Sequence, residues 1–249
     1  MKKKFGSSLI NHKTYVFASD GDLMEGISHE AMSLAGHLKL KNLIVFFDNN
    51  KISIDGSTSL SVSDNYKKRF EGYGWNFLEI NGHNEKEISK AITKASKSSK
   101  PTLISCKTVI GFGSPNKSGK ASSHGSPLGE EEISLVRKKL KWKSKPFEIP
   151  RDILNTWREI GEKGIKLEEK WSKIFEKKSN NIKSALKETY IESNLKDLEN
   201  LIKKEKTKYF ESKPSMATRQ CSSAAIESIS NILPQLIGGS ADLSGSNNT

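Results

Sequence analysis

Two polar segments near the start of the chain carry residue types that bind a divalent cation. Asp20 lies in Ser19-Asp20-Gly21, directly after an apolar run, and Asn50 lies thirty residues later, after a second apolar run. Carboxylate, amide and main-chain carbonyl oxygens are ligands of Mg²⁺ in proteins, usually together with phosphate oxygens. We therefore expect Asp20, the Asn50 side chain and the carbonyl of Ile52 to share one Mg²⁺ and to hold a diphosphate.

Gly21 adds to this expected anion site. A glycine lets a ligand approach the backbone closely, and the N-terminus of the helix that it opens favours negative charge. Taken singly, Asp-Gly is often only a turn and helix cap, and Asn-Asn is a common turn pair. The placement of both segments at the ends of consecutive strands favours a binding site over two unrelated turns.

The elements that must position these residues are short apolar runs that alternate with helical patterns. Strands are predicted over 14–18, 43–47, 75–80 and 102–107, and helices over 23–40, 64–71 and 85–96. Near-continuous apolar strands separated by helices are typical of an α/β fold whose parallel sheet is covered on both faces. In such a sheet the ends of consecutive strands emerge side by side, which would bring Asp20 and Asn50 together.

Composition and periodicity predict the structure of the rest of the chain. Residues 111–129 are rich in Gly, Ser, Pro and Lys and predict a long functional loop. Residues 130–210 predict charged helices interrupted at Pro146 and Pro150. A helix over 217–232 and a short strand over 235–237 indicate the start of a second α/β domain.

We therefore expect three parts along the chain. Residues 1–129 would form a partial diphosphate-binding domain, 130–213 a charged and mainly helical linker, and 214–249 the beginning of a further domain. A sheet cannot be completed by one strand, because the edges of that strand lack partners. The last part therefore predicts a fragment of a larger protein.

The net charge of the 249 residues is +12, which raises nucleic-acid binding as an alternative function. Most of the excess lies in residues 137–213, where 22 Lys and Arg stand against 13 Asp and Glu. The two signs alternate there, as they do on solvated helix faces. We therefore expect no nucleic-acid partner and keep a basic interaction protein as the second hypothesis.

The sequence also predicts a soluble, cytoplasmic chain with no membrane partner. Its longest unbroken aliphatic and aromatic run, 43–47, is far shorter than the roughly 20 residues that cross a bilayer. The two cysteines, Cys106 and Cys221, lie far apart in sequence and suit a reducing compartment.

Longer motifs make the interpretation more specific. They read SDGDLMEGISHEAMSLAGHLKL, DNNKISIDG, RFEGYGW, CKTVIGFGSPNKSG, SHGSPLG, PFEIP and LIGGSADLSGSN. Together these segments resemble transketolase, a family of thiamine diphosphate-dependent enzymes, over nearly the whole chain. The resemblance implies that 1–129 belongs to the diphosphate-binding domain and that 214–249 begins the pyrimidine-binding domain.

The resemblance assigns cofactor contacts by motif. Asp20, Asn50 and the Ile52 carbonyl would be the Mg²⁺ ligands, and Gly21 and Asn50 would contact the diphosphate of thiamine diphosphate. Asp242 falls where the family contacts the cofactor region. Ser19 occupies the first position of the family's usual Gly-Asp-Gly.

The resemblance also implies residues for substrate. His124 would approach both the cofactor and the substrate and act in proton transfer, whereas Arg219 and Ser246 would bind the substrate phosphate. Glu25 matches an acid of the carboxylate network that links the two active sites of a dimer. Arg suits phosphate because its planar guanidinium forms paired hydrogen bonds.

The function that the resemblance implies is transfer of a two-carbon ketol unit in the pentose phosphate pathway. The donor would be xylulose 5-phosphate, and the acceptors ribose 5-phosphate or erythrose 4-phosphate. Family members are homodimers, and this chain would need the rest of the enzyme or a missing complementary polypeptide. The glutamate that activates the cofactor would lie beyond Thr249, so we expect this chain alone to be inactive.

Overall fold

The computed structural model describes residues 1–190, 195–233, 235–240 and 242–249. The chain divides into two compact units, one made of residues 11–160 and the other of residues 1–10 with 161–249. The predicted boundaries at 129 and 213 remain predictions, and residues 191–194 of the expected linker lie outside the described residues.

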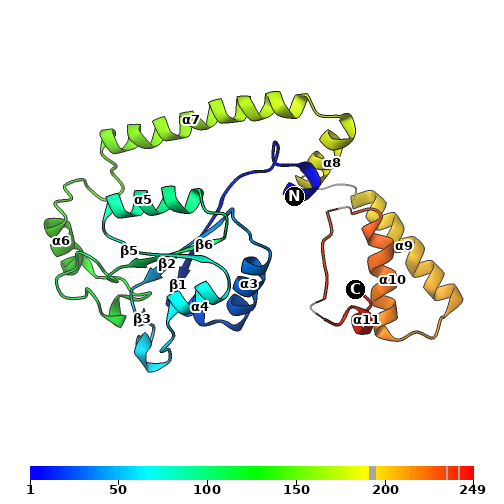
Figure 1. Cartoon of the computed structure of the whole chain (residues 1–249), viewed down its shortest axis with the longest axis horizontal. Helices are drawn as coiled ribbons and strands as arrows, with labels where there is room; N and C mark the ends of the chain where they lie inside the picture. Colours follow the sequence, from blue (N-terminus) through cyan, green and yellow to red (C-terminus); the bar gives the residue numbers. More distant parts are fainter. Residues whose placement is uncertain (191–194, 234, 241) are drawn as a thin grey trace. The chain divides into compact units, whose positions relative to one another are not determined.

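The unit 11–160 is built on a four-stranded parallel sheet (Figure 1). Its strands, in spatial order, are β1 (Thr14–Ser19), β2 (Leu43–Asn49), β6 (Thr102–Lys107) and β5 (Asn76–Asn81). The first two are neighbours in register, with Ser19 opposite Asp48. The residues that follow β1 and β2 therefore leave the sheet at the same edge.

Helices cover both faces of this sheet, in agreement with the predicted α/β fold. One face packs against α2 (Asp20–Met24), α3 (Gly26–His37) and α4 (Tyr66–Gly72), and the other against α5 (Glu85–Ser96). Phe47 and Leu103 are fully buried on the first face, and Ile44 and Ile104 on the second. Each such side chain contributes about 1.5–3 kcal/mol when it leaves water.

The helix predicted over 23–40 is two helices instead of one. Glu25 adopts an extended conformation with ψ 137°, so α2 ends at Met24 and α3 begins at Gly26. The hydrogen bond between Asp20 and Lys51 anchors the start of α2, and Leu23 of α2 and Ala35 of α3 pack against the same face of the sheet.

Smaller elements follow the strand ends. A hairpin of β3 (Ile52–Ser53) and β4 (Gly56–Ser57) comes after β2 and leads into the short 3₁₀ helix η1 (Thr58–Leu60). The loop after β6 contains the 3₁₀ turn η2 (Ala121–Ser123) and ends at α6 (Glu130–Lys139). The expected long loop is therefore present.

The other unit is helical. Its elements are α1 (Lys2–Phe5), the end of α7 (Arg151–Glu176), α8 (Asn180–Tyr190), α9 (Leu195–Ser212), α10 (Thr218–Ser230) and α11 (Ser244–Asn247). Its core joins Phe5, Leu9, Ile10, Phe175 and Leu186. Residues 235–237 adopt no strand, because no neighbouring strand pairs with them in the described residues of this unit.

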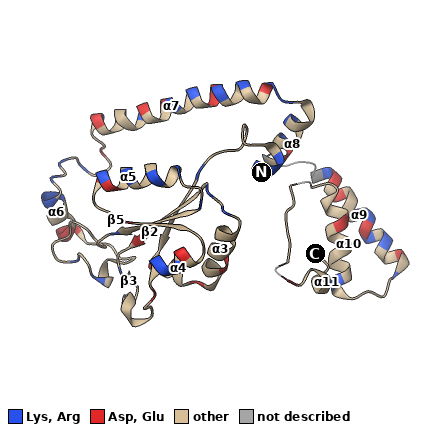
Figure 2. Ribbon diagram, in the orientation of Figure 1, with Lys and Arg blue, Asp and Glu red and all other residues tan. Residues whose placement is uncertain are grey.

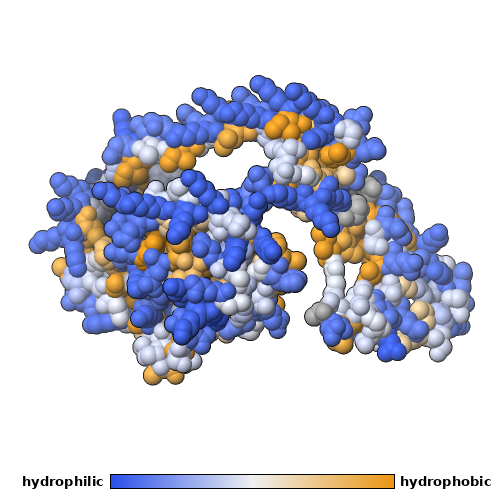
Figure 3. Space-filling model, viewed as in Figure 1, coloured by the Kyte–Doolittle hydropathy of each residue, from blue (hydrophilic) through white to orange (hydrophobic). Residues whose placement is uncertain are grey.

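Charged side chains of both signs alternate along α7 and α9 (Figure 2). Hydrophilic residues cover most of the visible surface, with smaller apolar patches between them (Figure 3). Within the described residues, no helix is long and apolar enough to span a membrane. On β1, Tyr15 and Phe17 remain exposed, with 82% of Phe17 accessible.

Candidate functional site

Asp20 follows β1 directly and opens α2 at the edge of the sheet. Only 2% of this residue is exposed, which is unusual for a carboxylate. Its Oδ2 atom accepts a hydrogen bond of 3.2 Å from the backbone N–H of Lys51, which lies in the segment after β2. The structure thus brings the ends of β1 and β2 together at this acid.

The electrostatics of Asp20 suit a bound cation. Burial raises the pKa of its carboxyl group, the backbone N–H groups of Lys51 and Asn50 oppose this, and the nearby charge of Asp48 adds to the rise. A cation at the carboxylate would offset the unfavourable burial of its negative charge. Such a cation would find oxygen ligands, as a hard ion requires.

Asn50 is held by its neighbours in the segment after β2. Its Nδ2 atom donates to Asp48 Oδ2 at 3.2 Å, and its Oδ1 atom accepts the backbone N–H of Ile52 at 2.9 Å. Asp48 also accepts a short hydrogen bond from the Thr108 hydroxyl, at the end of β6. Asp48 therefore joins the ends of two strands and fixes the Asn50 amide.

The predicted Mg²⁺ ligands contain a single carboxylate. Among the residues that the structure describes, no group of three or more His, Cys, Asp and Glu side chains could hold a metal ion. Asp20, the Asn50 amide and the Ile52 carbonyl form a different kind of set, with one charge and two neutral oxygens. Such a set fits Mg²⁺ when phosphate oxygens complete the coordination.

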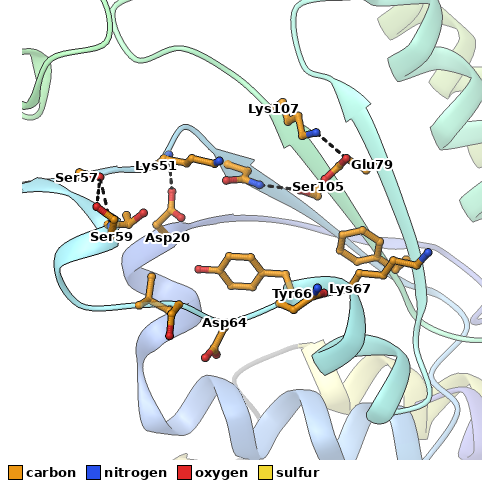
Figure 4. A pocket seen from close by; sticks show the side chains of 16 residues that line it. Asp20, Lys51, Ser57, Ser59, Asp64, Tyr66, Lys67, Glu79, Ser105 and Lys107 are labelled. Atoms are coloured by element: carbon orange, nitrogen blue, oxygen red, sulfur yellow. Dashed lines mark hydrogen bonds and ion pairs between the residues drawn. The ribbon is translucent and has the colours of Figure 1, made fainter.

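A cavity of about 730 Å³ opens beside Asp20 (Figure 4). Most of the residues that line it have polar side chains, among them Ser57, Ser59 and Lys107. The Tyr66 ring extends towards Asp20, and its buried hydroxyl finds no hydrogen-bond partner among the described residues. An unpartnered buried hydroxyl beside a buried carboxylate favours ligand binding at this place.

Ser19 and Gly21 flank the acid. Ser19 caps α2, since its hydroxyl accepts the Asp22 N–H and the Asp22 carboxylate accepts the Ser19 N–H at 2.7 Å. The Ser19 hydroxyl also donates to the Asp22 carboxylate at 2.7 Å, and the two hydrogen bonds that this carboxylate accepts from Ser19 lower the pKa of Asp22. A side-chain carbon added to Gly21 would meet only Ser19 Oγ, at 3.9 Å, so internal packing does not require a glycine there.

The other predicted residues lie elsewhere in the chain. His124 is exposed and follows η2, in the loop that begins at the carboxyl end of β6. Arg219 lies in the first turn of α10, Asp242 in a bend, and Ser246 in α11, all in the helical unit. The structure brings together Asp20, Asn50 and Ile52, whereas Arg219, Asp242 and Ser246 belong to the other unit.

Sequence reasoning missed three residues that support the site. Asp48 stands in the quoted DNN motif, so its position beside Asn50 was the available signal. Thr108 and Tyr66 carried no signal, because their contacts join segments far apart in the sequence.

Comparison with known proteins shows which family the chain resembles. The family model described as "Transketolase, thiamine diphosphate binding domain" matches residues 2–196. The chain is 48% identical over 257 residues to the transketolase of Buchnera aphidicola from Acyrthosiphon pisum. That match covers 98% of this chain and 37% of the relative, so the chain spans little more than a third of its length.

Solved structures agree in fold. The transketolase of Campylobacter jejuni matches with a TM-score of 0.80 and 38% identity, over 100% of this chain and 38% of that one. A transketolase from Pichia stipitis, solved with xylulose 5-phosphate, matches with a TM-score of 0.80 and 31% identity over the same shares. These comparisons give no support to the nucleic-acid alternative.

Proposed function

The chain belongs to the transketolase family, and from this premise we propose that it supplies the part of a transketolase that holds the diphosphate of thiamine diphosphate. The observation that carries the proposal is the meeting of Asp20 with the 50–52 segment at adjacent strand ends. That edge is where parallel sheets bind phosphate-bearing ligands.

The proposed Mg²⁺ ligands are Asp20, the Asn50 side chain and the Ile52 carbonyl. Asp20 supplies the negative charge, Asn50 is oriented by Asp48, and Gly21 leaves the backbone open to a diphosphate oxygen. When bound, thiamine diphosphate supplies the electron sink that cleavage beside a ketose carbonyl needs. The protein would bind and orient the cofactor, and the Mg²⁺ held by Asp20, Asn50 and Ile52 would neutralise charge on the phosphates.

The proposed substrates are sugar phosphates, with xylulose 5-phosphate as ketol donor and ribose 5-phosphate or erythrose 4-phosphate as acceptor. The Pichia stipitis relative was solved with xylulose 5-phosphate, which supports this class. Arg219 and Ser246 are proposed to bind the sugar phosphate group, and Asp242 to contact the cofactor region. His124 is proposed to move protons, since an imidazole ring carries one nitrogen that can accept a proton and one that can donate.

Turnover is proposed to need more polypeptide than this chain. The chain spans 37% of its Buchnera relative, and the remaining part would come from the rest of a homodimeric enzyme or from a complementary polypeptide. We place the reaction in the pentose phosphate pathway and the protein in the cytoplasm. The two cysteines, which form no disulfide, support a reducing compartment.

Titration calorimetry with thiamine diphosphate and Mg²⁺ tests the site. Asp20→Asn should weaken binding roughly tenfold or more, because metal affinity falls 10- to 100-fold even when supporting residues are lost. Asp55→Asn, an exposed change in the neighbouring hairpin, is the matched control and should bind as the wild type does. Equal affinity of the wild type and Asp20→Asn would exclude the metal role.

A further inference from the structure

A buried glutamate lies outside the candidate cofactor site. Glu132 is in the first turn of α6 and is only 7% exposed, whereas its neighbours Glu130 and Glu131 are exposed. A glutamate is seldom buried unless hydrogen bonds or a counter-charge compensate for the lost hydration. The hydrogen-bond partners of Glu132 therefore show what compensates for its burial.

All the partners of Glu132 belong to the loop that follows β6. Its Oε1 atom accepts hydrogen bonds from the Ser114 hydroxyl and from the Asn116 backbone N–H at 2.8 Å, and Oε2 accepts Asn116 Nδ2 at 2.9 Å. These hydrogen bonds lower the pKa of Glu132 to about 2. Bonds to an ionised acceptor are about twice as strong as neutral ones.

The hydrogen bonds continue from this anchor towards His124. Ser114 Oγ accepts the Lys117 backbone N–H at 3.0 Å, and the Lys117 carbonyl accepts the Ser123 hydroxyl at 2.5 Å. Ser123 directly precedes His124, whose own N–H donates to the Ala121 carbonyl at 2.8 Å. A continuous hydrogen-bonded path thus joins Glu132 to the residue before His124.

A second hydrogen bond holds the far end of the loop. The Lys117 ammonium group donates to the Leu128 carbonyl at 2.8 Å, on the other side of His124. Near the start of the loop, Gly111 has φ +63°, and a side-chain carbon there would lie 2.9 Å from Ser123 Oγ. Lys117, whose backbone N–H donates to the Ser114 hydroxyl, therefore contacts the chain on both sides of His124.

We propose that Glu132 is a positioning residue that fixes the 111–124 loop and thereby sets the place of His124 for cofactor and substrate. The role of His124 in this statement rests on the proposed function. Glu132 itself touches neither cofactor nor substrate. It acts through Ser114, Asn116 and Lys117.

Hydrogen exchange and NMR on the whole 249-residue chain test the proposal without any ligand. Glu132→Gln removes the negative charge of the acceptor that Ser114 and Asn116 share, so their hydrogen bonds weaken, and the backbone amides of Asn116 and Lys117 should exchange about ten to a hundred times faster. The His124 ring resonances should shift at the same time. Glu131→Gln removes the same charge from an exposed neighbour and should change neither readout.

Two further variants separate the possible failures. Ser114→Ala leaves Glu132 in place and should also speed exchange of the Lys117 amide. This variant tests the anchor if Glu132→Gln does not fold. Slow exchange of the Phe46 and Ile104 amides, which lie in the sheet, shows that a variant is folded. His124→Gln should leave exchange at Asn116 and Lys117 unchanged while weakening binding of thiamine diphosphate with Mg²⁺.

The outcomes are distinct. Faster loop exchange together with shifted His124 resonances in Glu132→Gln supports the proposal. Unchanged exchange overturns the anchor, and faster exchange with unmoved His124 resonances overturns the positioning role. Failure of the proposed function shows instead as equal cofactor binding by the wild type and His124→Gln, with the exchange results intact.

Discussion

The backbone N–H of Lys51 donates a hydrogen bond of 3.2 Å to the carboxylate of Asp20, although the two residues are 31 positions apart. The bond joins the residue after β1 to the segment after β2, so it links the ends of two neighbouring strands at one edge of the sheet. A backbone donor also cannot be removed by changing the Lys51 side chain. The geometry of the acid is therefore set by the fold more than by any single neighbour.

Asp48 should matter for cofactor affinity without touching the cofactor. Asp48→Asn replaces one acceptor oxygen by a donor, so it cannot accept from both Asn50 Nδ2 and Thr108 as the carboxylate does. We expect titration calorimetry with thiamine diphosphate and Mg²⁺ to show a loss of about 10- to 100-fold in affinity. Asp55→Asn, in the exposed hairpin after β2, is again the control. Undiminished affinity in Asp48→Asn would show that the orientation of Asn50 is set by other contacts.

Ser19 should stabilise α2 through its cap. Ser19→Ala removes the hydroxyl that pairs with Asp22 and should lower the free energy of unfolding by about 0.5–2 kcal/mol. Ser19→Gly, which restores the residue usual in the family, should lower it by only a few tenths of a kcal/mol. Urea unfolding followed by circular dichroism measures both changes. If the alanine variant is no less stable than the glycine variant, the cap contributes nothing.

The Glu132 anchor should make stability depend on acid pH. Hydrogen bonds in the folded state lower its pKa to about 2, from an ordinary value of 4.5, so the folded state binds the proton less readily than the unfolded chain. Its contribution is complete above about pH 4.5 and is lost as the pH falls through about 2. Urea midpoints between these values should fall more steeply in the wild type than in Glu132→Gln. If the urea midpoints of the two proteins fall equally with pH, the Glu132 carboxyl group does not cause the loss of stability.

The two cysteines should differ in reactivity. Burial, with the nearby charge of Asp48, raises the pKa of Cys106 to about 11, so roughly one molecule in a thousand carries its thiolate at pH 8. Cys221 is exposed. Iodoacetamide followed by peptide mass spectrometry should find Cys221 modified first in the native chain. In concentrated urea both should react at similar rates, and equal rates in the native chain would contradict the burial of Cys106.

Much of the sheet could be predicted from the sequence, because its strands are apolar runs with one dominant interpretation. The helix over 85–96 was predicted with the bounds that the structure has, since Asn84 caps it and its apolar spacing is regular. The break at Glu25 was not predicted, and neither was the contact of Asp20, at the start of α2, with a segment 31 residues away. Contacts of this kind depend on the assembled sheet and leave no local pattern.

The residues of the candidate site also differ in whether the sequence could predict them. Asp20 and Asn50 were found because each follows an apolar strand, and strand order alone brings them together. The Glu132 anchor was missed because an acid in the first turn of a charged helix is an ordinary surface residue by sequence. Only the loop folded against it makes that carboxylate exceptional.

The exposed first strand of the sheet has a practical consequence. In the described residues β1 pairs only with β2, so the backbone groups along its other side have no sheet partner, and Phe17 projects into solvent beside them. Open strand edges with apolar side chains recruit further strands, from another molecule if necessary. Purified at high concentration, this chain should therefore aggregate, and a lysine substituted for Phe17 should delay the onset of turbidity.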